Sequence, residues 1–196
     1  MAEHAIRHRP SVTIRVPMPP IANNIRLIVS DVDGVWTDGK IIYVGDRSEI
    51  KQFNVRDGLG VKLAQKAGIR VALITSRRSP ALERRARELG VVELRQGAAN
   101  KLLELEGVAK KLGVALDEVL YAGDDLPDLA PMSRCAISAA PADAAPEVLA
   151  AATWKLDAIG GNGAFRELVE RLLRERGDWE AILQEFMIGQ FDSQSV

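Results

Sequence analysis

Two aspartates separated by one residue, Asp31 and Asp33, follow a short apolar run that stops at Ser30. In an extended segment, residues two apart point to the same side, so these two carboxylates can share one small volume. Their mutual repulsion is most simply relieved by a hard divalent cation, Mg²⁺ above all. An Asp-rich turn, in which the side chains cap backbone amides, explains the same residues equally well. Gly34 suits both readings because it lets the backbone turn sharply.

Other polar residues stand where further apolar runs end. Thr75 and Arg77 follow the run at residues 70–74, and Asp124 follows the run at residues 118–122. If these runs are parallel strands, their carboxyl ends meet at the edge of the sheet where such sheets bind ligands. We therefore expect these side chains to gather around the first pair of carboxylates.

Apolar runs of strand length alternate with stretches of helical period along most of the chain. The expected strands cover residues 25–29, 70–74, 91–94, 118–122, 135–138 and 153–155. The expected helices cover residues 59–67, 80–89, 100–112, 145–151 and 164–176. This alternation predicts an α/β protein with a doubly wound, Rossmann-like parallel sheet and right-handed crossovers.

Three segments fall outside the alternation. Residues 40–53 contain two short β-rich runs joined by Gly45-Asp46-Arg47-Ser48, which predicts a hairpin directly after the acidic loop. Residues 1–24 are rich in proline and arginine without a sustained period, so we expect an N-terminal arm that is partly disordered. The single domain is expected over residues 25–177, followed by a C-terminal tail over residues 178–196.

The composition limits the partners of the chain. Lys and Arg total 26 against 27 Asp and Glu, a formal net charge of −1 that argues against nucleic-acid binding. No window is apolar enough for a membrane helix, and the N-terminus lacks the apolar core of a signal peptide. The single cysteine, Cys135, excludes an internal disulfide and suits a reducing compartment. We therefore expect a cytoplasmic protein that binds neither nucleic acid nor membrane.

Four motifs occur in order along the expected strands and helices. They are DVDGV at Asp31, a strand ending in Thr75-Ser76, Lys101 after a further crossover, and the GDDLPD segment that contains Asp124. One such motif is weak, whereas four in register on alternating strands are specific. Together they resemble the haloacid dehalogenase superfamily of phosphotransferases.

This resemblance implies a phosphoryl transfer centred on the first motif. Asp31 is the implied nucleophile, which attacks phosphorus to give an aspartyl-phosphate. Asp33 is the implied acid for the leaving oxygen and base for the hydrolytic water. Mg²⁺ is the implied cofactor, with metal ligands from Asp31, the backbone carbonyl of Asp33, and Asp124.

The same resemblance implies roles for the other motif residues. Thr75 and Lys101 are expected to hold the phosphate oxygens. Lys101 stands in the first turn of an expected helix, where a cation is unfavourable, so an anionic partner is expected beside it. Asp125 and Asp128 are expected to orient Lys101 and the waters of the metal.

A longer set of segments narrows the resemblance. DVDGVWTDG, KQFNVRDGLGVK, ITSRRSPALERRARELG, QGAANK and GDDLPD look like one family, the 3-deoxy-D-manno-octulosonate (KDO) 8-phosphate phosphatases. The resemblance implies a phosphomonoesterase of lipopolysaccharide precursor biosynthesis that lacks a cap domain. It also implies a homotetramer in which the hairpin at residues 40–53 acts as a flap, so that neighbouring subunits cover each active site.

Family contacts with the sugar-acid phosphate carry over to a set of residues rich in cations, which suit a substrate with both a phosphate and a carboxylate. They are Asp33, Asn54, Val55, Arg56, Asp57, Gly58, Arg77, Arg85 and Lys101. For Arg85, the rival explanation is a solvated arginine in a basic helix. Trp36, Ser76 and Asn162 depart from the family pattern.

Two rival functions stay open at this point. The first is the same chemistry on a nine-carbon keto-sugar acid 9-phosphate of the sialic-acid type, because the electrostatics of the two sites would be alike. The second is a non-catalytic relative that keeps the fold as an assembly module. The acid at Asp33 argues against the second rival, since a binding module has no need of it.

Overall fold

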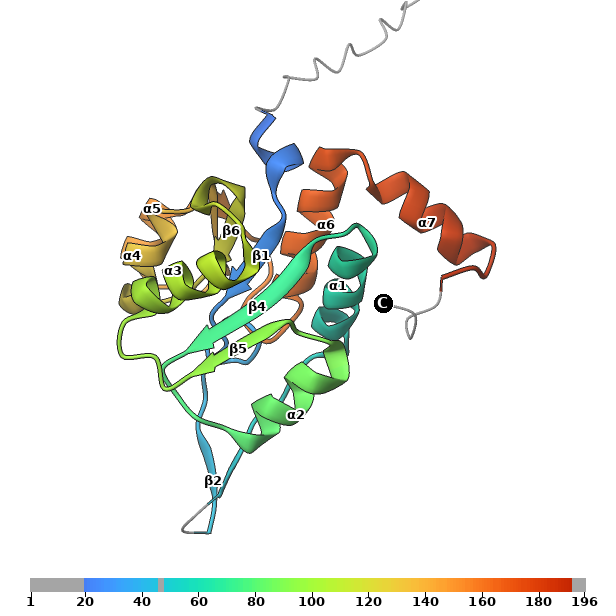
Figure 1. Ribbon diagram of the computed structural model, residues 1–196. Helices are drawn as coiled ribbons and strands as arrows, with labels where there is room; N and C mark the ends of the chain where they lie inside the picture. The colour runs from blue at the N-terminus through green and yellow to red at the C-terminus, as the bar shows by residue number, and fades with distance from the viewer. Residues whose placement is uncertain (1–19, 46–47, 192–196) are drawn as a thin grey trace, which may run out of the picture.

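The computed structural model describes residues 20–45 and 48–191. Its main sheet has six strands in the order β5-β4-β1-β6-β7-β8, and every neighbouring pair is parallel. The strands are β1 (Leu27–Ser30), β4 (Arg70–Thr75), β5 (Glu93–Gln96), β6 (Val119–Ala122), β7 (Ile137–Ala140) and β8 (Trp154–Lys155). The predicted doubly wound α/β fold is confirmed (Figure 1).

β1 lies in the middle of the sheet, and all four of its residues are buried. The register pairs Ser30 with Leu73 of β4 and with Ala122 of β6. Asp31 therefore leaves the sheet at its carboxyl edge, where its amide still donates to the carbonyl of Ala122 at 2.8 Å. Thr75 ends β4 two residues beyond Leu73, so it reaches the same edge.

Helices cover both faces of this sheet (Figure 1). One face carries α1 (Val55–Lys66), α2 (Pro80–Leu89), α6 (Ala164–Arg176) and α7 (Trp179–Met187). The other carries α3 (Lys101–Leu112), α4 (Leu129–Met132) and α5 (Pro146–Ala151). Three 3-10 turns complete the described part of the chain: η1 (Pro20–Asn24), η2 (Leu116–Glu118) and η3 (Leu126–Asp128). Among the helices that the structure describes, none is both long and apolar enough to cross a membrane.

Helix α1 begins at Val55, four residues before the start that helical spacing indicates. Asn54 caps it by accepting a hydrogen bond from the amide of Arg56 at 2.9 Å. Gly58 and Gly60 weaken the local helical signal because glycine costs about 1 kcal/mol in a helix relative to alanine. Both are buried, and a Cβ at Gly60 would lie 3.1 Å from the backbone of α6, so tight packing explains the glycine there.

The β5 strand also differs from its predicted position, by two residues. Gly90 ends α2 in a left-handed conformation, with φ of 69°. The amide of Val91 then bonds back to the carbonyl of Ala86 at 3.0 Å, which closes the helix. The chain therefore joins the ladder only at Val92, and β7 likewise begins two residues later than predicted.

The predicted hairpin is present as a separate two-stranded antiparallel sheet, β2 (Ile42–Val44) and β3 (Ser48–Ile50). It extends away from the domain beyond the carboxyl edge of the main sheet (Figure 1). Its apolar side chains are open to solvent, with Tyr43 exposed by 73%. Residues 46 and 47 of its turn lie outside the described residues. Within the described ranges, the chain between the strands of the main sheet forms no cap domain.

The two ends of the described chain contribute to the core. Residues 20–24 of the expected arm form η1, in which Ala22 is buried, and residues 1–19 lie outside the description. Within the expected tail, Trp179 and Ile182 of α7 join the same core cluster. An ion pair of 2.8 Å between Lys66 and Glu185 ties α7 to α1.

Candidate active site

Asp31 contacts a buried lysine at the carboxyl edge of β1. The Nζ atom of Lys101 lies 3.0 Å from Asp31 Oδ1 and 2.8 Å from Asp128 Oδ1. Each of the three side chains is less than a tenth exposed. Asn100 starts α3 by accepting hydrogen bonds from two backbone amides of the first turn, which places Lys101 at that end. Lys101 therefore has two anionic partners in a position that the helix dipole disfavours.

Asp128 uses both of its carboxylate oxygens to hold neighbouring groups. Its Oδ1 accepts hydrogen bonds from Lys101 and from the hydroxyl of Tyr121, both at 2.8 Å. Its Oδ2 accepts from the amides of Asp124 and Asp125, at 3.3 and 3.4 Å. Because four donors already surround it, this carboxylate fixes the lysine and the loop after β6.

Asp124 completes a cluster of three carboxylates with Asp31 and Asp128, whose oxygens lie within 4.8 Å of one another. The Oδ1 atom of Asp124 is buried without a hydrogen-bond partner. Gly34 makes this approach possible, since its φ is +94° and a Cβ there would lie 2.0 Å from Asp124 Oδ2. A buried, unpartnered oxygen beside a second carboxylate fits a hard divalent cation.

Burial perturbs the pKa values of these groups. Desolvation raises the pKa of Asp31 from 3.8 to about 6; the charge of Asp128 adds to this effect and Lys101 opposes it. Desolvation followed by the charge of Asp31 raises the pKa of Asp124 to about 8. Burial disfavours the ammonium of Lys101, but the two carboxylates beside it outweigh this and raise its pKa. One lysine therefore does not fully compensate the cluster, and a cation would relieve the remaining repulsion.

The Asp33 carboxylate does not belong to this cluster. Its Oδ1 forms an ion pair with Lys51, and its Oδ2 accepts a hydrogen bond from Thr75 Oγ1 at 3.3 Å. Lys51 comes from the segment between β3 and α1, and Thr75 from the end of β4. The side chain of Asp33 is therefore held from two elements, beside the buried carboxylates and still 21% exposed.

The hairpin reaches the site through a second acid. Glu49 of β3 accepts a hydrogen bond from Arg77 at 2.6 Å, and its other oxygen lies 3.8 Å from Lys51 Nζ. Glu49 raises the pKa of the Arg77 guanidinium by accepting this bond. Arg77 therefore lies beside the site, where its ion pair with Glu49 connects the loop after β4 to the hairpin.

The residues at the start of α1 divide into exposed and buried ones. Val55 is 80% exposed and Arg56 is exposed beside it. Asp57 is 1% exposed, and its Oδ1 accepts a hydrogen bond from the amide of Arg166 at 2.9 Å. Burial raises the pKa of Asp57, while backbone amides at the start of α6 oppose the shift. The structure therefore gives this carboxylate the role of a cap for a neighbouring helix.

The loop before α6 packs on the acidic loop itself. The amide of Gly161 donates to the carbonyl of Val35 at 3.0 Å, and Asn54 Nδ2 donates to the carbonyl of Gly161 at 3.4 Å. A Cβ at Gly160 would lie 1.9 Å from the carbonyl oxygen of Gly34. The C-terminal third of the sequence therefore braces the turn that follows Asp31.

Arg85 lies against α1. A Cβ at Gly58 would lie 2.2 Å from its guanidinium, and its NH1 is 3.5 Å from Glu88 of the same helix. The side chain is 23% exposed. The guanidinium of Arg85 therefore covers Gly58. This position decides neither for the predicted contact with an anionic substrate nor for the alternative of a solvated arginine.

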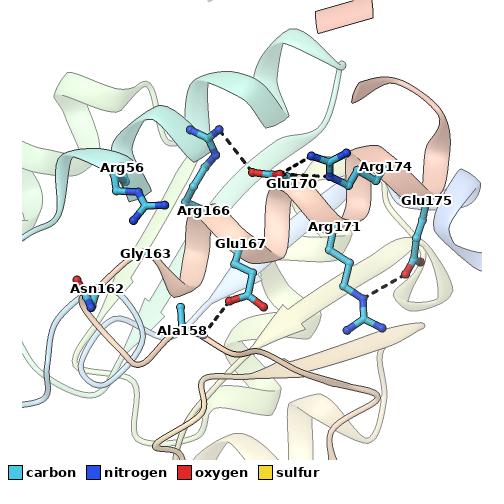
Figure 2. A pocket seen from close by; sticks show the side chains of 10 residues that line it. All are labelled: Arg56, Ala158, Asn162, Gly163, Arg166, Glu167, Glu170, Arg171, Arg174 and Glu175. Atoms are coloured by element: carbon cyan, nitrogen blue, oxygen red, sulfur yellow. Dashed lines mark hydrogen bonds and ion pairs between the residues drawn. The ribbon is translucent and has the colours of Figure 1, made fainter. Parts of the chain in front are cut away.

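A separate cavity of about 400 Å³ lies along α6, and Figure 2 shows the residues that line it. Asp31, Asp124 and Asp128 are not among them. The cavity is lined by Arg56, Asn162, Gly163 and the charged face of α6. The arginines of that face are paired within the helix, as in the 2.7 Å contact between Arg174 and Glu170. This cavity therefore holds charges that largely neutralise one another, and it does not contain the residues of the four motifs.

The departures from the family pattern have different surroundings. Trp36 is buried, with its Nε1 donating to Ser30 Oγ at 3.1 Å and its ring 4.7 Å from that of Phe165. Ser76 is exposed after β4, and Asn162 lines the cavity beside α6. The tryptophan therefore serves the packing between the acidic loop and α6.

Three side chains of the site carry no signal in the sequence that marks them as functional. Lys51 and Glu49 stand in the hairpin region, where a local pattern does not tell which side chains turn toward the sheet edge. Tyr121 stands in the buried strand VLYA, so the sequence predicts only a core residue. The structure shows that its hydroxyl donates a hydrogen bond to Asp128.

Known proteins show the same fold and the same sequence pattern. Residues 88–168 match the family model for haloacid dehalogenase-like hydrolases. The KDO 8-phosphate phosphatase of Salmonella typhi is 44% identical over 157 residues, which cover 80% of this chain and 83% of that protein. The Haemophilus influenzae enzyme of the same name is 40% identical, with coverages of 79% and 86%.

Solved structures agree with this relationship. KDO 8-phosphate phosphatase from Moraxella catarrhalis, solved with a magnesium ion, a phosphate ion and a KDO molecule, superposes with a TM-score of 0.82 at 38% identity. The alignment covers 85% of this chain and 95% of that one. The Yersinia pestis enzyme gives a TM-score of 0.80 at 41% identity, with coverages of 82% and 86%.

The fold and the carboxylate site define a haloacid dehalogenase-like hydrolase that acts on phosphomonoesters. Within that class, the chain belongs to the family of 3-deoxy-D-manno-octulosonate 8-phosphate phosphatases.

Proposed function

We propose that this chain hydrolyses KDO 8-phosphate to KDO and phosphate with the help of Mg²⁺. The observation that carries the proposal is the buried cluster of Asp31, Asp124 and Asp128 around Lys101. Family membership and the Moraxella catarrhalis complex with magnesium, phosphate and KDO support the same substrate and ion. The fold, the cluster and the family agree on phosphoryl transfer at the edge of the sheet.

In this proposal, Asp31 is the nucleophile. One of its carboxylate oxygens attacks phosphorus, the bond from phosphorus to the sugar oxygen breaks, and an aspartyl-phosphate forms. Water then attacks phosphorus, which releases phosphate and regenerates the carboxylate. Lys101 lies 3.0 Å from Asp31 Oδ1, so its ammonium also orients the nucleophile and offsets the charge of an incoming phosphate.

Asp33 is the acid and base of the two steps. It gives a proton to the departing sugar oxygen and takes one from the hydrolytic water. Its position at the exposed side of the buried cluster, with Thr75 beside it, suits contact with a leaving group. Thr75 is the other proposed donor to the phosphate, through the hydroxyl that donates to Asp33 Oδ2 at 3.3 Å.

Asp31, Asp124 and the backbone carbonyl of Asp33 are the proposed ligands of Mg²⁺. The buried, unpartnered Oδ1 of Asp124 is the observation that supports this set. When bound, the ion supplies positive charge that lets an anionic nucleophile approach an anionic phosphate. Asp128 is not included, because its oxygens are already bonded to four donors.

The remaining substrate contacts are proposed from cations around the site, of which the side chain of Arg77 is 38% exposed and that of Arg85 is 23% exposed. Arg77 and Arg85 are proposed for the phosphate and the carboxylate, with Lys101 below them. Arg56 and its neighbours at the start of α1 are exposed and available to a substrate, either in their own subunit or in a neighbouring one. Asp57 of the predicted set is buried and accepts a hydrogen bond from the amide of Arg166, so we propose a structural role for it and no direct contact with substrate.

A homotetramer in the cytoplasm, with a place in lipopolysaccharide precursor synthesis, completes the proposal. The hairpin supports the assembly, since Ile41, Ile42, Tyr43 and Val44 are all at least 48% exposed. A lone two-stranded hairpin is marginal in water, and contact between copies would bury these side chains. Light scattering on the protein and on an Ile42→Asp variant tests the assembly; a monomeric parent with full turnover would contradict it.

The activity is tested by phosphate release from KDO 8-phosphate, a nine-carbon keto-sugar acid 9-phosphate and glucose 6-phosphate. We expect Mg²⁺-dependent release that is fastest with KDO 8-phosphate. Asp31→Asn should abolish it, whereas Asp117→Asn, an exposed aspartate of η2, should not change it. Residual activity of Asp31→Asn within about tenfold of the parent would overturn the nucleophile assignment. Faster release from the nine-carbon substrate would contradict KDO 8-phosphate as the substrate and favour the rival phosphatase function. Inactivity on all three substrates would favour a non-catalytic assembly module.

A further inference from the structure

Lys51 is a buried cation that the reaction scheme above does not use. Its side chain is 5% exposed, although it follows a hairpin whose own apolar residues face solvent. An ammonium is costly to bury unless it is paired, and the partner of Lys51 is the Oδ1 atom of Asp33. Glu49 lies 3.8 Å away as a second, more distant partner. The hairpin thus delivers a positive charge directly to the proposed acid and base.

The two oxygens of Asp33 are held by different parts of the chain. Oδ1 pairs with Lys51, and Oδ2 accepts from Thr75 at 3.3 Å. A carboxylate gripped at both oxygens cannot rotate freely about its side-chain bonds. Without Lys51, the Asp33 carboxylate would keep the 3.3 Å hydrogen bond from Thr75 and the charge of Arg77, but no direct ion pair to hold Oδ1.

We propose that Lys51 is a positioning residue for proton transfer by Asp33, and that the hairpin is thereby part of the catalytic apparatus of its own subunit. This inference rests on the proposed role of Asp33. Lys51 acts by fixing the direction in which the Asp33 oxygen faces the leaving group. The alternative is that Lys51 only anchors the hairpin, in which case its loss would affect all substrates alike.

The choice of leaving group separates these two roles. A sugar alkoxide needs a proton from the enzyme to depart, whereas 4-nitrophenolate departs readily without one. In the step that releases the leaving group, a residue that positions the acid therefore matters for the first kind of substrate and hardly for the second. A residue that anchors the hairpin, or that binds phosphate, matters for both.

The test compares kcat/KM of Lys51→Met and Lys51→Arg on KDO 8-phosphate and on 4-nitrophenyl phosphate. This ratio ends at the departure of the leaving group, so it leaves out the later hydrolysis of the aspartyl-phosphate, in which Asp33 would serve both substrates as base. For Lys51→Met we expect a loss of about 10- to 100-fold on the sugar phosphate and a change below about threefold on the aryl phosphate. The loss stays at or below the lower end of the roughly 10²- to 10⁴-fold that general acid catalysis contributes, because the acid is misdirected and not removed. Lys51→Arg should recover most of the loss because it keeps the charge. The matched control is Lys40→Met: Lys40 flanks the hairpin on its other side and also pairs with an acid, Asp38 at 2.8 Å, but is 76% exposed.

Equal losses on both substrates, or no loss on either, would overturn the inference. Asp33→Asn is measured in parallel, because a variant without selective loss on the sugar phosphate would refute the role of Asp33 itself. In the Asp33→Asn background, Lys51→Met should cost no more than about twofold further on KDO 8-phosphate, since both changes remove one function. An additional loss of tenfold or more in the double variant would show that Lys51 acts independently of Asp33.

Discussion

Removal of divalent metal should make the stability of this protein depend strongly on pH, through the buried carboxylates. Folding raises the pKa of Asp31 from 3.8 to about 6 and that of Asp124 to about 8. Below about pH 3 both the folded and the unfolded chains hold these protons, so the pKa shifts of these groups do not change the stability. As the pH rises, the unfolded chain releases its protons first, and the folded state is progressively destabilised up to about pH 8.

The size of this effect follows from Asp31, which is 5% exposed. A pKa raised from 3.8 to about 6 corresponds to about 3 kcal/mol of lost folding free energy once the carboxylate is ionised. In a chain of this length, that loss lowers the melting temperature by about 6–12 °C. Mg²⁺ should restore most of it near pH 8, because the ion binds the ionised carboxylates of the folded state.

The assay is thermal unfolding of chelator-treated protein between about pH 4.5 and pH 8.5, with and without Mg²⁺. Asp31→Asn is the internal reference, because it keeps the shape of the side chain and removes its titration. The difference in melting temperature between parent and variant should change with pH by at least the amount above. Groups that do not interact with Asp31 cancel, whereas Asp124, whose pKa the charge of Asp31 raises, adds to the change in the same direction. Parallel pH profiles for the two proteins would refute the reasoning.

Three further changes test the rest of the site. Lys101→Met should lower the free energy of unfolding by about 3–5 kcal/mol in urea titrations, since it leaves buried carboxylates unpaired, and a loss below about 1 kcal/mol would contradict the buried ion pairs. Tyr121→Phe should cost about 1.5–3 kcal/mol by removing a hydrogen bond to the charged Asp128, and an unchanged urea midpoint would count against that bond. Gly34→Ala should abolish Mg²⁺ binding in calorimetry, because a Cβ collides with a ligand, whereas Gly68→Ala, also at positive φ but with open space around it, should bind Mg²⁺ like the parent.

Much of the fold follows from the sequence because its signals are local. Strand-length apolar runs and capped amphipathic helices give the alternation that a parallel sheet requires, and β1 ends where Asp31 begins. The gathering of Asp31, Asp124 and Lys101 at one sheet edge follows in turn from parallel topology. Their contact is a consequence of strand order, which the pattern of elements restricts to few possibilities.

Other features depend on contacts that no local pattern contains. Gly58 and Gly60 obscure the start of α1 in the sequence. They are needed because a side chain at Gly58 would meet Arg85, and one at Gly60 would meet α6. The pairing of Lys51 with Asp33 depends on how a solvent-exposed hairpin folds back toward the sheet, and side-chain alternation does not encode that direction. From the sequence, Asp57 is indistinguishable from an acid that contacts substrate, whereas its role as a cap requires the start of α6 to lie against α1.

The place of β1 and of the loop before α6 has a consequence for protein synthesis. β1, which Asp31 directly follows, leaves the ribosome before its two neighbours in the sheet, β4 and β6, have been made. The loop at residues 160–161, which braces the turn after Asp31, emerges later still. A nascent chain therefore carries Asp31 without a finished scaffold until residues 160–161 have been translated. The order of translation thus keeps the site unformed until the loop before α6 has been made.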